Sequence, residues 1–133
     1  MIKLTVYGET PSKKNSRVFT KGGRFIPSAA HREWHQGALI DLAVQLKKMG
    51  PERPVKIETP VAICLTFYHG NNVRRDCDNQ TSSILDLLQD AQVLADDCWQ
   101  IVREITVRNK ADKGHARCEI DIMTIDMEAA ECQ

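Results

Sequence analysis

The segment 61–68 constrains the fold more strongly than any other part of the chain. Its residues alternate between two uncharged faces, with Val61, Ile63, Leu65 and Phe67 on one and Ala62, Cys64, Thr66 and Tyr68 on the other. A strand that is uncharged on both faces is typical of the middle of a sheet, where other elements cover it. The segment therefore predicts a central strand around which the other elements are arranged.

Three further segments, 2–7, 101–109 and 115–125, have the two-residue periodicity of strands. The last two are separated by a short turn, so we expect them to form an antiparallel hairpin. In the first strand of that hairpin, Ile105 and Val107 are expected to face inward.

Two segments have the apolar spacing of helices. The first spans residues 29–49, with Ser28 as a good N-cap and Gly50 suited to the C-terminal end. The second runs from residue 79 to about residue 92.

With 133 residues and 42% hydrophobic content, the chain can bury one core. We predict an α+β (mixed α/β) fold: one compact domain with a mixed, mostly antiparallel sheet, two main helices and a frayed acidic tail at about 127–133.

Carboxylates stand on both sides of the second predicted helix. Asp76 and Asp78 precede it, and Asp96 and Asp97 follow it. In an extended segment, side chains two positions apart point the same way, so Asp76 and Asp78 are expected to aim at one point. Asp78 is also expected to cap the helix. Carboxylate oxygens suit Mg²⁺ or Mn²⁺, although an isolated Asp-x-Asp is more often a solvated loop with a helix cap.

The length of the second helix raises a difficulty for one shared metal site. A helix of about 14 residues is roughly 20 Å long. The segment 93–97 covers only about 17 Å when fully extended. Asp97 therefore returns to Asp78 only if the chain doubles back along the helix, the helix ends early, or a second subunit completes the site.

The net charge is zero, but the charges are unevenly distributed. Residues 1–75 carry 13 Lys or Arg and five Asp or Glu, whereas residues 76–133 carry five and 13. A basic half beside an acidic half indicates a phosphate-facing surface next to a metal site, although ordinary solvated charges would give the same asymmetry. The candidate DNA contacts lie in loop 11–15, in a hairpin predicted around Gly22-Gly23, and before Asp76: Lys13, Lys14, Asn15, Arg17, Lys21, Arg24, Arg74 and Arg75.

Other sequence patterns bear on the cellular location and on metal binding by cysteine or histidine. No segment resembles a signal peptide or a membrane span, and the five cysteines lack the paired spacing of a zinc site, which fits a reducing cytoplasm. His31 and His35 lie one helical turn apart but lack the glutamate of a His-Glu-x-x-His motif. Solvent-facing or DNA-facing histidines are therefore favoured over a metal pair.

The sequence resembles the RusA-type Holliday-junction resolvases, which are small phage and prophage endonucleases. The resemblance is carried by Arg74-Arg75-Asp76-Cys77-Asp78-Asn79, by Asp86, and by Leu94-Ala95-Asp96-Asp97. The segment Pro11-Ser12-Lys13-Lys14-Asn15 also resembles the family's N-terminal motif.

This resemblance implies a homodimer that binds four-way junction DNA and nicks two opposed strands with Mg²⁺ or Mn²⁺. By position, Asp76, Asp78 and Asp97 would be the catalytic, metal-binding carboxylates, with Asp96 beside them. The family usually has a catalytic lysine at the position of Ser82. Its missing charge would have to come from elsewhere, and the candidates are Lys13, Lys14 and Arg75.

Side chains near the four carboxylates are candidates for a supporting role: Asn79, Ser82 and Asp86. For Asp86, a solvated or capping role is favoured.

A metal-dependent junction endonuclease is the leading interpretation. The alternatives are a junction-DNA-binding protein whose catalysis is weakened by Ser82, and a structural protein whose carboxylates only cap a helix.

Overall fold

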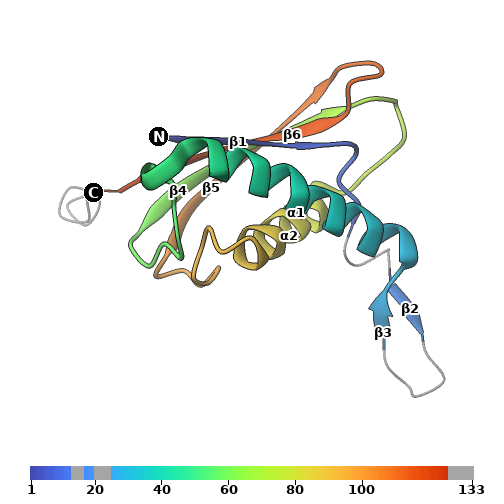
Figure 1. Ribbon diagram of the computed structural model, residues 1–133. Helices are drawn as coiled ribbons and strands as arrows, with labels where there is room; N and C mark the ends of the chain where they lie inside the picture. The colour runs from blue at the N-terminus through green and yellow to red at the C-terminus, as the bar shows by residue number, and fades with distance from the viewer. Residues whose placement is uncertain (13–16, 20–24, 126–133) are drawn as a thin grey trace.

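The computed structural model describes residues 1–12, 17–19 and 25–125 (Figure 1). In chain order, its elements are β1 (Ile2–Tyr7), β2 (Arg17–Phe19), β3 (Phe25–Pro27), α1 (Ala29–Met49), the short 3-10 helix η1 (Gly50–Glu52), β4 (Val61–His69), α2 (Cys77–Asp90), β5 (Val102–Ala111) and β6 (Arg117–Thr124). No helix in these ranges is both long enough and apolar enough to cross a membrane.

The main sheet has the strand order β1-β6-β4-β5, so β4 lies in its interior as the sequence predicts. The β1–β6 and β6–β4 pairs are antiparallel, and the β4–β5 pair is parallel. The predicted α+β fold with a mixed, mostly antiparallel sheet and two helices is therefore confirmed. The short strands β2 and β3 pair separately as the predicted antiparallel hairpin.

The expected hairpin between β5 and β6 is wrong. The two strands follow one another in the chain, but β4 lies between them and pairs with both. The reason is the helix: β4, α2 and β5 form a crossover unit, which places β5 parallel to β4 on its free edge. The chain then passes the end of β4, and β6 pairs with the opposite edge.

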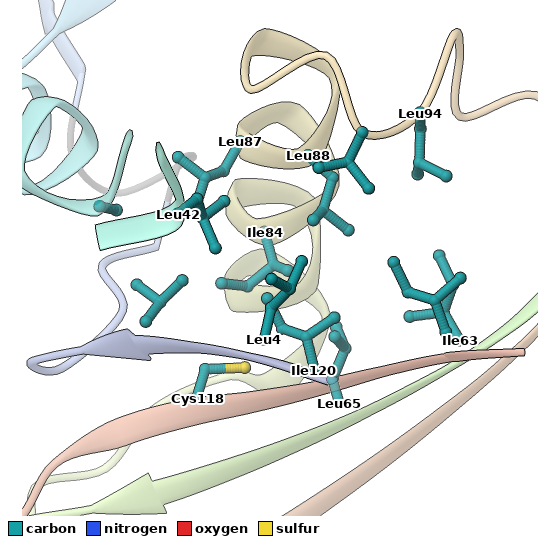
Figure 2. Packing of buried hydrophobic residues seen from close by; sticks show 14 of the residues in the cluster. Leu4, Leu42, Ile63, Leu65, Ile84, Leu87, Leu88, Leu94, Cys118 and Ile120 are labelled. Carbon is teal, nitrogen blue, oxygen red and sulfur yellow. The ribbon is translucent and has the colours of Figure 1, made fainter. Parts of the chain in front are cut away.

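Both helices pack on one face of the main sheet (Figures 1 and 2). The sheet contributes alternate residues of β1, β4 and β6, and each helix contributes one apolar face. The buried residues include Leu4, Ile63, Leu65, Cys118 and Ile120 from the sheet, Leu42 from α1, and Ile84, Leu87 and Leu88 from α2. Burial raises the pKa of the Cys118 thiol, which therefore stays protonated as a core group.

The ends of α1 match their prediction. The Ser28 hydroxyl accepts a hydrogen bond from the His31 backbone N–H at 3.1 Å, and Gly50 follows the helix with φ +63°. The expected exposure of His31 is wrong, because its side chain is buried beside Trp34. His35 lies 2.7 Å from Asp90 of α2 through its Nε2 atom, so this histidine links the two helices.

The start of α2 differs from its prediction by two residues. The helix begins at Cys77, and the N-cap is Asp76 rather than Asp78. Asp78 therefore lies in the first helical turn and not in an extended segment, so the expected two-residue alternation of Asp76 and Asp78 does not apply.

The inner face of β5 is less covered than its sequence predicts. Val107 is partly buried against the core, but Ile105 is 42% exposed. Its register partner Ile63 on β4 is only 1% exposed. The difference arises because β5 is an edge strand, whereas β4 has a strand on each side.

This pair of isoleucines provides a matched stability test. Ile63→Ala should lower the free energy of unfolding by about 2–5 kcal/mol, because it leaves a cavity in the core. Ile105→Ala should cost about 1 kcal/mol, because much of its side chain already contacts water. Urea unfolding of the two variants measures both values, and equal losses would show that the inner face of β5 is covered.

Candidate functional site

A hollow of about 460 Å³ opens where β4 ends and α2 begins. The loop after β1 forms one wall, and the segment leading into α2 forms the other. Its lining residues are Glu9, Thr10, Pro11, Ser12, Arg74, Arg75, Asp76 and Gln80. The hollow therefore joins the predicted N-terminal phosphate-binding loop to the first predicted metal ligand.

Asp76 and Asp78 are both exposed at the N-terminal end of α2. Asp76 has the extended backbone of an N-cap, but its side chain makes no capping hydrogen bond to the described first turn of the helix. One oxygen of Asp78 accepts the Asn79 backbone N–H at 2.9 Å. Both side chains therefore retain carboxylate oxygens that can meet a hard cation.

Asp96 and Asp97 are exposed near the other end of α2. The segment that carries them runs beside residues 56–61, where Ala95 N–H donates to the Ile57 carbonyl at 3.0 Å. This segment adjoins the start of β4, whereas Asp76 follows the end of β4 (Figure 1). The intervening 14-residue helix is roughly 20 Å long.

The two halves of the predicted acidic cluster are consequently separated within one chain. Across residues 1–12, 17–19 and 25–125, no three His, Cys, Asp or Glu side chains are grouped so that they could hold a metal ion. The helix neither ends early nor is followed by a chain that returns along it, since Leu94 pairs with Ile57 beyond its C-terminal end. Two of the three ways to unite Asp97 with Asp78 are therefore excluded.

The loop after β1 is fastened to the inner face of α2. Gln80 Nε2 donates to the Thr10 carbonyl at 2.7 Å, and Ser83 Oγ donates to the Pro11 carbonyl at 2.8 Å. Gln80 and Ser83 were not among the predicted site residues. The sequence feature that could have revealed them is a polar residue at two positions on the same buried face of α2 as Leu87.

The predicted DNA contacts fall into three groups. Arg74 is exposed and lines the hollow, as a phosphate-binding residue requires. Arg75 is only 18% exposed and forms an ion pair with Glu9, so it is engaged within the protein. The remaining residues are Lys13, Lys14, Asn15, Lys21 and Arg24, which lie outside the described residues, and Arg17, which lies in β2.

Two of the predicted supporting residues lie near Asp78. Asn79 follows it directly, and Ser82 is exposed one turn further along, with its hydroxyl donating to the Asp78 carbonyl at 3.4 Å. Asp86 instead lines a second hollow, of about 390 Å³, together with His31, His35 and Asp90 between the two helices. Asp86 therefore lies apart from the hollow that contains Asp76.

The chain matches one known protein family over most of its length. Residues 8–123 match the family model described as Endodeoxyribonuclease RusA. The chain belongs to the RusA family. This family comprises endodeoxyribonucleases that bind and resolve Holliday junctions. The match covers the hollow and both acidic segments, and no curated protein matches the chain.

Proposed function

We propose that this RusA-family protein is a metal-dependent endonuclease that resolves Holliday junctions by nicking two opposed strands. The observation that carries the proposal is the exposure of four carboxylates at the two ends of α2: Asp76, Asp78, Asp96 and Asp97. Paired carboxylates open to solvent are the ligands that Mg²⁺ or Mn²⁺ takes beside a substrate phosphate.

The active unit is proposed to be a homodimer in which each site takes residues from both subunits. Asp76 and Asp78 would come from one chain, and Asp97, with Asp96 beside it, from the other. The roughly 20 Å helix between these groups supports this arrangement, because a rigid rod keeps them apart within one chain. A two-fold dimer would then present two equal sites to the two opposed strands of a junction.

Within each site, the chain's own residues bind and orient the DNA. The carboxylates of Asp76, Asp78 and Asp97 would hold one or two divalent ions, and Arg74 would contact a neighbouring phosphate. When bound, a divalent cation supplies Lewis acidity that activates a water molecule and stabilises the leaving oxygen. Lys13 and Lys14 follow the loop segment fastened by Gln80 and Ser83 in the chain and are proposed to contact the same DNA backbone.

Replacing Asp76 with asparagine tests the assignment of the metal ligands. Asp76→Asn should reduce cleavage of a synthetic four-way junction at least about 100-fold in Mg²⁺ and in Mn²⁺, because the exchange removes an anionic ligand. Junction binding without divalent metal should stay within about twofold, since phosphate contacts dominate affinity. Undiminished cleavage by Asp76→Asn would refute the assignment, and Glu33→Gln on the exposed face of α1 serves as the control.

Ser82 provides a test of the missing lysine. The exposed Ser82 hydroxyl is neutral, and Arg75 is paired with Glu9, so neither replaces a free cation beside Asp78. Ser82→Lys should raise the cleavage rate by about tenfold or more, through stabilisation of transition-state charge. Gln36→Lys, which adds the same charge to α1, should leave the rate nearly unchanged.

The same assay separates the two leading functions. Paired nicks by the natural sequence would support the resolvase. Tight junction binding without nicks, followed by cleavage in the Ser82→Lys variant, would identify a junction-binding protein with a weakened site.

A further inference from the structure

The Glu9 carboxylate, which lines the hollow, contacts three residues that lie far from it in the sequence. Both of its oxygens lie 3.1 Å from His69 Nδ1 at the end of β4. One oxygen lies 3.2 Å from Arg75 Nε, and the other accepts from Gln80 Nε2 at 3.2 Å. Glu9 was not among the predicted site residues, because its partners are 60 to 71 positions away in the sequence.

Each partner of Glu9 is held by a second contact. His69 Nε2 lies 2.9 Å from Asn109 Oδ1 on β5, and Gln80 also donates to the Thr10 carbonyl. The network therefore ties the loop after β1 to the sheet on one side and to α2 on the other. The side chains of Glu9 and Arg75 are 25% and 18% exposed, so their charges are screened less by water than a surface pair would be.

Arg75 also forms hydrogen bonds within the loop that leads into α2. Its Nη1 donates to the Val73 carbonyl at 2.9 Å, and its Nη2 donates to Asn71 Oδ1 at 2.7 Å. Asn71 Oδ1 also accepts the Val73 backbone N–H at 3.2 Å. Residues 70–76 contain no strand or helix, so these side-chain contacts take the place of a regular hydrogen-bond ladder in fixing the backbone.

We propose that Glu9 is a positioning residue: by holding Arg75, it fixes the loop 70–75 and thereby the place of Asp76 in the metal site. This inference rests on the proposed function. Asp76 directly follows Arg75 and makes no capping hydrogen bond to the described first turn of α2. The Asp76 side chain is thus not held by the helix that follows, and the backbone that precedes it is fastened through Arg75 to Glu9.

Two measurements on the full-length protein test this role. Glu9→Gln keeps the size of the side chain but removes the charge that holds Arg75. Hydrogen exchange should become about tenfold faster in a peptide covering residues 70–76, while a peptide from β6 stays unchanged. Mn²⁺ affinity, measured by electron paramagnetic resonance without DNA, should fall by about tenfold or more.

Two further variants separate positioning from general stability. Glu52→Gln, at an exposed position in η1, should change neither loop exchange nor Mn²⁺ affinity. If Glu9→Gln does not fold, Arg75→Lys retains the positive charge but loses the forked contacts to Asn71 and Val73, and it should give the same two effects.

The outcomes distinguish this inference from the proposed function. Unchanged loop exchange in Glu9→Gln, or faster exchange with unchanged Mn²⁺ affinity, would overturn the positioning role alone. If the natural sequence neither binds Mn²⁺ nor cleaves a junction, the proposed function fails, and the metal-site role of Glu9 fails with it. In that case the effect of Glu9 on loop exchange would still be measurable.

Discussion

The packing of α2 along β4 is the constraint on which the rest of the structure depends. Leu87 and Leu88 of α2 lie in one buried cluster with inner residues of β4, including Leu65. Burial of this helix face holds the 14-residue helix α2 against the sheet. It therefore supports Asp76 and Asp78 at one end and keeps Asp96 and Asp97 near the other.

The same packing explains why Asp97 and Asp78 lie apart within one chain. Bringing Asp97 to Asp78 within a subunit would require the helix to shorten or to leave the sheet, and either change would expose buried leucine side chains to water. Completing the site with a second copy requires neither change. The proposed composite site is thus the arrangement that preserves the core, and it would make metal binding depend on assembly.

The sequence predicted those parts of the fold that local patterns determine. The uncharged alternation of β4 placed it inside the sheet, and Ser28 and Gly50 marked the ends of α1. The pairing of β5 depended on where α2 crosses the sheet, which no local pattern encodes. Ile105 was misjudged because an alternating pattern indicates which face a side chain shares, but not whether another element covers that face.

The candidate site divides in the same way. Neighbouring carboxylates such as Asp76 and Asp78 could be recognised from their spacing, and the family match covers them. The separation of Asp97 was anticipated only as a geometric difficulty and needed the observed length of α2. The role of Arg75 was not predictable, because a basic residue before an acidic motif suggests DNA binding, whereas its partner Glu9 lies far away in the sequence.

Nicking by a mixed dimer tests the central claim most directly. The two subunits would carry Asp76→Asn and Asp97→Asn respectively, and the mixed dimer would be purified through two different tags. If each site takes Asp76 from one chain and Asp97 from the other, both substitutions fall in one site and the second site stays intact. The mixed dimer should then nick a four-way junction with about half of the wild-type sites, while each pure variant is inactive. A mixed dimer as inactive as the pure variants would contradict the account, because it would place every site within a single chain.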